Sequence, residues 1–392
     1  MLLRLLRILE RSATHHDDVA YLDFVPHVAS DAEIADLSAR VNWYLPTGSR
    51  TTNVYSGAAA GSASPQPENA PYMDARLVSQ PGWSKDRPQG RRHVVLHRFT
   101  PRSALEYLRS PGNATVVSQT FAYGSDEAYF ELHRRFCSTR PPSADASADR
   151  LLSLQTPAAT ALVVATGPSA SLLDEQSIAA SDIRITCNSA VRDSSLMEML
   201  RPDVIAFSDP VFHYGPSRYA ASFRADLMRA LDETGALLLT SQLFVEPLLA
   251  HTPELKERLV VLPLTSRGPW RWPSAGQPST RITGNVLTNL MLPAAFALAD
   301  HVLVAGCDGR QTSERYYWRH NPATQYSDGL MRTAFDAHTA FFRDRDYADY
   351  YETHCKQLDE FFATAERAGK SITGVTPSYI PALLARGAPS FS

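Results

Sequence analysis

The chain has 392 residues, too many for one compact core at roughly 150 residues per domain, so we expect two domains. It is 44% hydrophobic, 20% charged and 9% aromatic. This is an ordinary composition for a soluble globular protein and excludes fibrous and wholly disordered classes. The formal net charge of −3 is too balanced for a general nucleic-acid binder.

The four cysteines stand far apart and form no C-x-x-C pair; they are Cys137, Cys187, Cys307 and Cys355. This spacing predicts neither a zinc knuckle nor a disulfide framework, and it fits a reducing compartment. The longest charge-free stretch, residues 282–299, contains asparagines and a proline. It therefore indicates a buried helix rather than a membrane span.

The first ten residues combine leucines with Arg4 and Arg7 and lack the features of a signal peptide. Two interpretations stay open for residues 1–10. They form a helix docked on the chain's own core, or a basic amphipathic helix on an anionic membrane surface. We expect a cytoplasmic protein, with any membrane contact made peripherally at the inner face of the inner membrane.

In the first part of the chain, short apolar runs alternate with helical patterns, which favours a parallel sheet covered by helices. The expected order is a helix from about residue 35, a strand at 41–45, a loop at 57–71, a strand at 93–97, a helix at 103–109, a strand at 114–118 and a helix at 127–136. Residues 138–149 have the composition of a linker. They predict a boundary between an amino-terminal domain, 1–150, and a carboxyl-terminal domain, 151–392.

The alternation restarts more strongly after residue 150. Strands are expected at 161–165, 183–187, 204–208, 236–240, 259–262 and 301–306, and helices at 284–299 and 333–368. The fold class is therefore α/β, with two Rossmann-like domains facing a cleft.

Polar residues follow the apolar runs where each predicted strand ends. The ends carry Thr166-Gly167-Pro168-Ser169, Asn188-Ser189, Ser208-Asp209-Pro210 and Asp308-Gly309. In open parallel sheets, ligands bind beyond the carboxyl ends of the strands. A glycine turn that opens a helix suits a phosphate, although the same turn would also serve as a simple strand-to-helix connection with a serine cap.

Several familiar motifs are absent. The first turn is not G-x-G-x-x-G, which disfavours a nicotinamide or flavin dinucleotide, and residues 369–371 do not complete a P-loop. Asp344-Arg345-Asp346 matches the D-x-D of metal-dependent sugar transferases but fits a solvated helical face better. No cluster has zinc-ligand spacing, and no G-x-S-x-G elbow occurs.

Two further stretches are candidates. Arg281, Thr283 and the N–H groups of Gly284 and Asn285 would converge on one anion at a helix start. Alternatively, Thr283 only caps that helix and Arg281 lies on the surface. The aromatic run 316–326 contains His320, which either titrates near neutrality in a site or belongs to a packing loop.

The order of five short motifs resembles the bacterial CMP-sialic-acid-dependent sialyltransferases over roughly residues 157–310. The motifs are Val163-Val-Ala-Thr-Gly-Pro-Ser, Cys187-Asn188, Phe207-Ser-Asp-Pro, Arg281-Ile-Thr-Gly and Leu303-Val-Ala-Gly-Cys-Asp. The resemblance implies that CMP is held at Thr166 and Asn188. We expect Gly167, Ser169, Ser208 and Asp308, at the same strand ends, to contribute to the CMP site. The resemblance also implies that Arg281, Thr283, Gly284 and Asn285 meet the phosphate or the sugar carboxylate, and that no metal or other cofactor is needed.

The chain departs from those sialyltransferases in three ways. Asp209 stands where they have asparagine, no histidine stands at 349–351 where their catalytic base falls, and a full amino-terminal domain is present. With these differences the pattern looks most like the bacterial β-Kdo transferases. That resemblance implies two domains, CMP-β-Kdo as donor, retention of configuration, and lipopolysaccharide or capsule glycans as acceptors.

Retention by double displacement needs a side-chain carboxylate, and Asp209 is the candidate nucleophile. The acceptor needs a base, for which Glu127 and His320 are candidates and Glu131 is a weaker choice. Asp209 would otherwise cap the Pro210 turn, and the carboxylates around Glu127 would otherwise form an acidic helix start. Three other functions stay open: an inverting sialic or pseudaminic acid transferase, a pyrophosphokinase-like enzyme that needs ATP and Mg²⁺, and a nucleotide-binding protein without turnover.

Overall fold

The computed structural model of the chain describes residues 19–25, 31–45, 53–55, 89–97, 100–109, 113–117, 125–242, 245–310, 321–337 and 347–391. Within these ranges no helix is long and apolar enough to cross a bilayer. Four predicted features lie outside the described residues: the segment 1–10, the loop 57–71, His320 and the Asp344–Asp346 run.

The amino-terminal part is a parallel sheet of four strands in the order β2-β1-β3-β4. The strands are β1 (Val19–Val25), β2 (Asn53–Tyr55), β3 (Arg91–Leu96) and β4 (Ala114–Val116), and the helices are α2 (Asp31–Tyr44), α3 (Pro101–Arg109) and α4 (Ser125–Phe136). The strand predicted at 41–45 is wrong, because these residues complete α2. Leu37, Val41 and Tyr44 are all buried, and their spacing of four and three residues is that of one helical face.

The predicted linker is shorter than expected. Residues 144–149 belong to α5 (Ala144–Leu152), whose first turn is capped by the Ser143 side chain, which accepts from Ala146 N over 3.2 Å. Ala148 and Leu151 are buried, and α5 packs on the edge strand β9 of the second sheet. The serine therefore starts a helix rather than continuing a linker.

The carboxyl-terminal part is a parallel sheet of seven strands in the order β13-β12-β5-β6-β7-β8-β9. The strands are β5 (Thr160–Val164), β6 (Ile183–Cys187), β7 (Val204–Ala206), β8 (Leu237–Ser241), β9 (Leu259–Leu262), β12 (His301–Ala305) and β13 (Ser371–Gly374). A separate two-stranded sheet joins β10 (Leu264–Thr265) and β11 (Thr280–Arg281). The α/β fold class and the Rossmann-like parallel sheets are confirmed.

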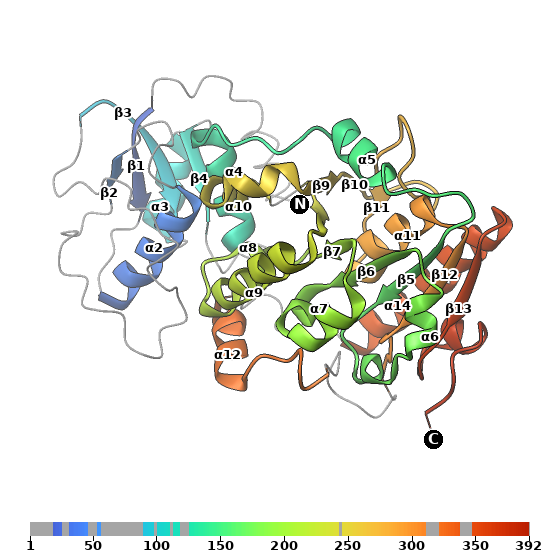
Figure 1. Cartoon of the computed structure of the whole chain (residues 1–392). Coiled ribbons are helices and arrows are strands. Elements are labelled where there is room, and N and C mark those ends of the chain that lie inside the picture. Colours follow the sequence, from blue (N-terminus) through green and yellow to red (C-terminus); the bar gives the residue numbers. More distant parts are fainter. Residues whose placement is uncertain are drawn as a thin grey trace.

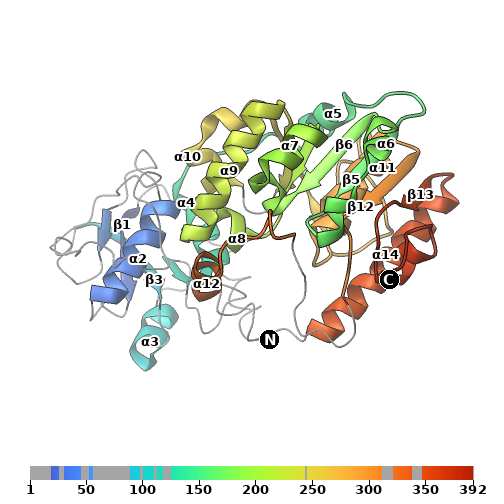
Figure 2. The same cartoon turned by 60° about the horizontal axis from the view of Figure 1, so that its bottom comes forward.

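Helices cover both faces of the large sheet (Figures 1 and 2). They are η3 (Pro168–Leu172), α6 (Glu175–Ala179), η4 (Asn188–Arg192), α7 (Ser194–Leu200), α8 (Pro210–Tyr214), α9 (Arg218–Thr234), α10 (Glu246–His251), η5 (Pro253–Glu257), η6 (Leu287–Met291), α11 (Leu292–Leu298), α12 (Asp328–Ala337), α14 (Tyr347–Arg367) and α15 (Pro381–Leu384). Alternate residues of β5 enter different cores, since Leu162 and Val164 pack on one face and Ala161 and Val163 on the other. Both faces are thus buried, which explains the continuous apolar runs in the sequence.

The two sheets are joined by a packed interface rather than by a loose connection. Helices α8, α9 and α10 lie between them (Figure 1), and one hydrophobic core extends from β1 and α2 into α9. At its centre is Trp43 of α2. Its indole N–H donates to the Tyr214 carbonyl over 2.5 Å, and its ring stacks on His251 with centroids 4.1 Å apart.

Arg224 of α9 completes this interface. Its guanidinium carbon lies 4.0 Å from the centre of the Trp43 ring, and Nη1 donates to the carbonyls of His213 and Gly215. Burial lowers the pKa of Arg224 to about 9, so the side chain stays charged at neutral pH. A buried cation over an indole face is stabilised by the ring's electron density.

Stability should fall in mild acid because of buried histidines. Burial lowers the pKa of His133, His213 and His354 to about 4, below the unfolded value of about 6.5. Between these values the unfolded chain binds more protons, so the free energy of unfolding decreases as the pH falls from 6.5 to 4, by on the order of 1 kcal/mol per pH unit for each histidine. Urea unfolding across this range measures the slope.

His213→Phe should make this slope shallower, because it removes one of the titrating side chains. The fold should tolerate phenylalanine, since the ring centroids of Phe207 and Phe223 lie 5.2 and 4.4 Å from that of His213. An unchanged slope in this variant would contradict the assignment.

Candidate functional site

The strand order of the large sheet reverses between β5 and β12. From β5 the chain moves outward through β6, β7, β8 and β9, whereas β12 and β13 lie on the other side of β5. In such sheets the ligand crevice lies outside the carboxyl ends of the two strands at the reversal. The predicted polar strand ends are therefore at the edge where a ligand is expected.

The turns after β5 and β12 touch through their backbones. Gly167 N donates to Gly306 O over 2.9 Å, and Ala165 N donates to Ala305 O over 3.0 Å. A Cβ atom on Gly167 would collide with the Asp308 carboxylate and the Gly306 carbonyl. Gly306 has a φ of +66° and would in turn meet Ala165 O. Both glycines are needed because the two turns approach each other this closely.

Ser169 and Asp308, both predicted to bind the nucleotide, bind each other. Ser169 N donates to Asp308 Oδ2 over 2.9 Å, and the Ser169 hydroxyl donates to Oδ1. Thr376 Oγ1, after β13, lies 3.0 Å from Ser169 Oγ and accepts from Gly306 N over 2.9 Å. Burial raises the pKa of Asp308, and the Ser169 hydrogen bonds oppose part of that rise. These side chains tie three strand ends together; a contact with nucleotide stays a prediction.

Asn188 ends β6, the neighbour of β5. It has a φ of +48°, a left-handed conformation that asparagine tolerates better than most residues. Its Oδ1 is buried and accepts no hydrogen bond from the described residues. Leaving such an acceptor unsatisfied costs about 1–3 kcal/mol. Thr166, half-buried beside it on the β5 turn, accepts through its carbonyl from Asn321 N over 2.8 Å.

Asp209 follows β7, the next strand of the sheet, with Ser208 just before it. Both residues are half-buried. Asp209 Oδ1 accepts from Phe212 N over 2.9 Å, which makes it the cap of α8. The capping role that the sequence left open is therefore present. The hydrogen bond also fixes the carboxylate at the carboxyl edge of the sheet.

The loop 281–289 is shaped by its own polar side chains. Thr283 Oγ1 donates to Asn289 Oδ1 over 2.8 Å and accepts from Asn285 N over 3.3 Å, while Asn285 Oδ1 accepts from Leu287 N over 2.8 Å. Thr283 thus orders the loop before η6 but does not cap that helix, whose first N–H, that of Leu287, donates to Asn285 Oδ1. The side chain of Asn285 is likewise engaged within the loop.

The expected helix at 284–299 begins with a π-helical turn, η6, before α11. Pro293 has no N–H to donate to the Asn289 carbonyl four residues earlier. That carbonyl instead accepts from the buried Thr280 hydroxyl over 2.8 Å. The proline thus accounts for one of the α-helical hydrogen bonds missing from this turn, and π turns of this kind occur often at functional sites.

Tyr350 of α14 is a site residue that the sequence did not single out. Its hydroxyl donates to the Gly284 carbonyl, and a Cβ on Gly284 would collide with the Tyr350 ring. Burial raises the pKa of Tyr350, and the charge of Asp209 raises it further. This interaction indicates that Asp209, Gly284 and Tyr350 lie in one neighbourhood. In the sequence, this stretch is marked only by the absence of a histidine at 349–351.

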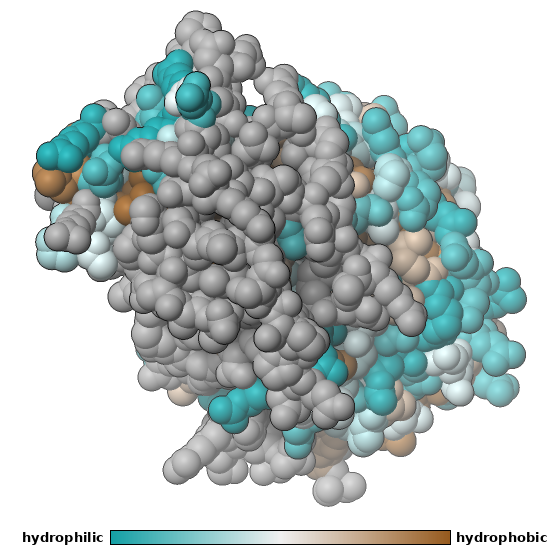
Figure 3. Space-filling model, turned by 90° about the vertical axis from the view of Figure 1, so that its left-hand side faces the viewer, coloured by the Kyte–Doolittle hydropathy of each residue, from teal (hydrophilic) through white to brown (hydrophobic). Residues whose placement is uncertain are grey.

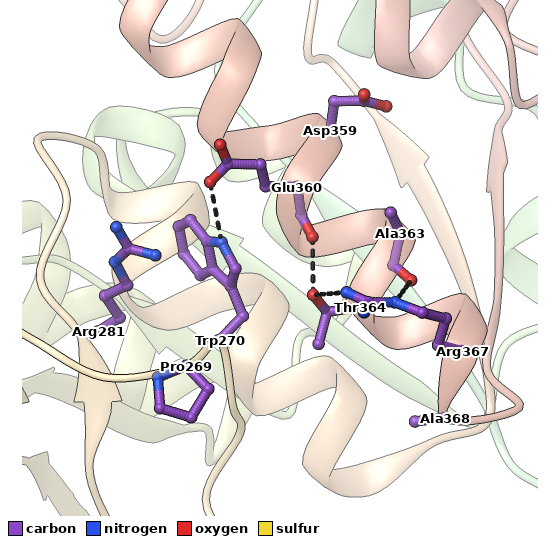
Figure 4. Close-up of a pocket in the computed structure, with 9 residues that line it drawn as sticks. All are labelled: Pro269, Trp270, Arg281, Asp359, Glu360, Ala363, Thr364, Arg367 and Ala368. Atoms are coloured by element: carbon purple, nitrogen blue, oxygen red, sulfur yellow. Dashed lines mark hydrogen bonds between the residues drawn. The ribbon is translucent and has the colours of Figure 1, made fainter.

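The Arg281 side chain packs against an aromatic ring. Its guanidinium carbon lies 4.5 Å from the centre of the Trp270 ring, and it lines a pocket of about 730 Å³ with the later part of α14 (Figure 4). The residues around this pocket are Pro269, Trp270, Arg281, Asp359, Glu360, Ala363, Thr364, Arg367 and Ala368. Tyr350 and Thr364 are separated by about 20 Å along the helix at 1.5 Å per residue. The shared anion site of Arg281, Thr283 and Gly284 stays a prediction.

Glu131 is the candidate base whose side chain the structure describes. Glu127 lies in the first turn of α4, and its side chain falls outside the described residues. Glu131 makes ion pairs with Arg134 at 3.7 Å and Arg135 at 3.8 Å. Among the residues that the structure describes, no group of three His, Cys, Asp or Glu side chains could hold a metal ion.

No protein-family model matches the sequence, and no curated protein matches it. Among solved structures, the chain is similar to the sialyltransferase CstII from Campylobacter jejuni, determined in complex with the substrate analogue CMP-3FNeuAc. The two are 11% identical with a TM-score of 0.32, over 59% of this chain and 86% of that chain. A likeness this low carries no inference, so the fold assignment rests on the strand order.

Gly167→Ala should destabilise the fold, because the added methyl group has no room between Asp308 and Gly306. We expect the free energy of unfolding to fall by about 2 kcal/mol, the usual cost of overpacking. Gly329→Ala in α12 is the matched control, since nothing lies within 4 Å of its Cβ position. It should leave the stability unchanged or raise it by about 0.5 kcal/mol. Equal urea midpoints for the two variants would contradict the tight contact.

Proposed function

We propose that the chain is a glycosyltransferase that takes a 2-ulosonic acid from its CMP ester. The donor proposed is CMP-β-Kdo, and the acceptor is a bacterial surface glycan. The proposal rests on the motif order in the sequence and on the positions of Thr166, Asn188 and Asp209 at successive strand ends. The observation that carries it is the buried Oδ1 of Asn188, which no described group satisfies.

A nucleotide base would satisfy that oxygen once the half-buried Asn188 side chain turns to expose it. The exocyclic amine of cytosine is a donor, and a donor that meets a buried acceptor recovers the cost of leaving it unpaired. Asn188 lies one strand away from the reversal between β5 and β12. We therefore propose that cytidine lies over β6 and that its phosphate faces the Thr166 turn.

We propose that the anomeric carbon of the donor lies next to the Asp209 carboxylate. In the first step a carboxylate oxygen bonds to the anomeric carbon, and the bond from that carbon to the phosphate oxygen breaks, so CMP leaves with the electron pair. In the second step the acceptor oxygen bonds to the same carbon and the bond to Asp209 breaks. The acceptor proton passes to a base, for which we propose Glu127 or His320. Two inversions give net retention.

Stabilisation of the departing phosphate is proposed to come from the protein without a metal ion. The hydroxyl of Thr166, on the turn after β5 at the strand reversal, is the donor proposed for this role. Preorganised donors of this kind stabilise developing negative charge. Turnover should therefore continue in EDTA.

One observation favours a second function. Asp209 Oδ1 accepts from Phe212 N, which is a sufficient structural reason for an aspartate at this position. In an inverting sialic or pseudaminic acid transferase, Asp209 would cap α8 and bind donor hydroxyls. The configuration of the product, determined by NMR, distinguishes the two functions.

CMP should bind without Mg²⁺, and Asn188→Gly should weaken that binding by about tenfold, the equivalent of one hydrogen bond to a buried group. Glycine is the suitable replacement because it keeps the left-handed backbone without strain. Titration calorimetry with EDTA present measures the affinity. Asn113→Ala, at β4 in the other sheet, is the control and should bind CMP as the wild type does. Tight ATP binding that requires Mg²⁺, with no CMP binding, would favour the pyrophosphokinase-like function.

Asp209→Asn should lower turnover by about a thousandfold or more while keeping the fold. Asparagine caps a helix as well as aspartate does, but its amide is not a nucleophile. Asp193→Asn is the matched control, because Asp193 caps α7 in the same way, through Leu196 N at 3.1 Å. Intact-protein mass spectrometry of the wild type with CMP-Kdo should reveal a one-sugar adduct that maps to Asp209. Near-normal turnover of Asp209→Asn would exclude the nucleophile.

A further inference from the structure

The charged side chains of the amino-terminal sheet pair with one another. Arg92 lies 3.1 Å from Asp23 and also pairs with Glu106. In Figure 3, which faces this end of the molecule, the coloured surface is mainly hydrophilic and its apolar spots are small and separate. Arg192, at the carboxyl edge of the large sheet, is used differently. It makes no ion pair with any residue that the structure describes, and its guanidinium donates to backbone carbonyls instead. Its role therefore follows from the segment that carries those carbonyls.

The segment 321–326, which we call the strap, links two neighbouring strand ends of the large sheet. At one end, Asn321 N donates to the Thr166 carbonyl, on the turn after β5, over 2.8 Å. Further along, the strap contacts Arg192, the last residue of η4, which Asn188 opens after β6. In Figures 1 and 2 the chain before α12 runs toward α7, the helix that follows η4. Because β5 and β6 are adjacent strands, the strap lies at the two strand ends where the nucleotide is proposed.

The strap is a compact turn. The Asn321 carbonyl accepts from Thr324 N over 2.9 Å and from Gln325 N over 3.0 Å, and Asn321 Oδ1 accepts from Ala323 N over 2.9 Å. Thr324 is fully buried, and its hydroxyl donates to the same Asn321 carbonyl over 3.0 Å. An asparagine side chain that bonds the backbone two residues on closes many turns in this way. Residues 321–325 should therefore move as one unit, held in place by their outer contacts.

Arg192 supplies the contact between this unit and η4. Its Nη1 lies 3.0 Å from Ala323 O and 3.4 Å from Pro322 O, and it also donates to Gln325 O. The guanidinium carbon lies 5.5 Å from the centre of the Tyr326 ring. A guanidinium bonds carbonyl oxygens more strongly than a neutral donor does, because the charge assists the hydrogen bond. Three carbonyls gathered at one nitrogen therefore fix the distance between the strap and η4.

Tyr326 holds the far end of the strap on α9 through contacts of its own. Its hydroxyl donates to Asp226 Oδ2 over 2.6 Å, and its ring meets the Tyr219 ring edge-on, with centroids 5.0 Å apart. Both tyrosines are buried. Removal of the Arg192 guanidinium should thus loosen the strap from η4 while the end of the strap stays on α9.

We propose that Arg192 is a positioning residue for the nucleotide. By holding the strap against η4, it keeps the chain beside Thr166 and Asn188 in the arrangement that receives CMP. Arg192 itself touches no part of the ligand. A site that is ordered before the ligand arrives binds more tightly, because binding does not have to fix the chain. This role rests on the proposed function, since it assumes that the nucleotide lies at the ends of β5 and β6.

Arg192→Met tests this role, because methionine keeps an apolar stem and removes the donors and the charge. In titration calorimetry, CMP binding should weaken by about tenfold, while the urea midpoint stays close to that of the wild type. Hydrogen exchange, measured without ligand, should become faster at the Thr324 and Gln325 amides, whose bonds to the Asn321 carbonyl depend on the order of the strap. Arg192→Lys keeps a cation with N–H donors and should recover part of both effects.

The matched control is Arg150→Met. Arg150 Nη1 donates to the carbonyls of Lys256 and Leu259 over 2.9 and 2.6 Å. This variant therefore removes the same kind of contact and the same charge at the edge strand β9, away from the strap. It should bind CMP as the wild type does and leave the exchange of the strap amides unchanged. An equal loss of affinity in both variants would attribute the effect to stability or net charge and overturn the proposal.

Two further results would overturn it. One is CMP binding by Arg192→Met with wild-type affinity. The other is weakened binding with unchanged exchange of the strap amides, because Arg192 would then contact the nucleotide directly. A wild type that binds no CMP would refute the proposed function, and the positioning of CMP with it. The exchange measurement, made without ligand, would still decide whether Arg192 holds the strap.

Discussion

A buried carboxylate holds the ligand edge of the large sheet together. Asp308 accepts hydrogen bonds from both the amide and the hydroxyl of Ser169, and Thr376 joins them from the end of β13. Such a group is costly to bury unless its oxygens are satisfied. Gly167 and Gly306 let the two turns approach closely, and this approach allows Ser169 to hydrogen-bond the Asp308 carboxylate. The three strand ends at the reversal are therefore held together by hydrogen bonds between buried groups.

The same atoms serve the fold and the proposed chemistry. Asp209 caps α8 with one oxygen, and Asn188 uses its tolerance of a positive φ to turn the chain after β6. Neither task explains the full chemistry of the side chain, since serine or glycine would perform each of them. These structural tasks leave the negative charge of Asp209 and the unsatisfied side-chain oxygen of Asn188 unexplained. These two groups are the strongest reason to expect a ligand at these strand ends.

Local patterns in the sequence were sufficient for the strands of the large sheet and their polar ends, because buried parallel strands are short apolar runs closed by small residues. They were insufficient for contacts between distant segments. Ser169 lies 139 residues from Asp308 and 207 from Thr376, so the sequence could not show that these three side chains are hydrogen-bonded to one another.

The contact of Arg281 with Trp270 was also beyond local patterns. The direction of a long side chain depends on its tertiary partner. For the Arg281 guanidinium that partner is the Trp270 ring. The strand expected at 41–45 failed because its five-residue window was too short to reveal that Leu37 and Val41 share a helical face. Tyr350 could not be found at all, because its only signal is the glycine that makes room for it.

The Trp43 interface limits how far the two sheets can move relative to each other. Trp43 comes from one domain, whereas Arg224, His251 and Tyr214 come from the other, and all four are in contact through rings, charge or hydrogen bonds. Swinging the domains apart would strip a buried cation of its aromatic cover and expose its charge in a partly open, poorly hydrated gap. Large hinge bending is therefore energetically penalised in this architecture. For the proposed transferase, donor and acceptor would have to meet without a large rotation of one sheet against the other.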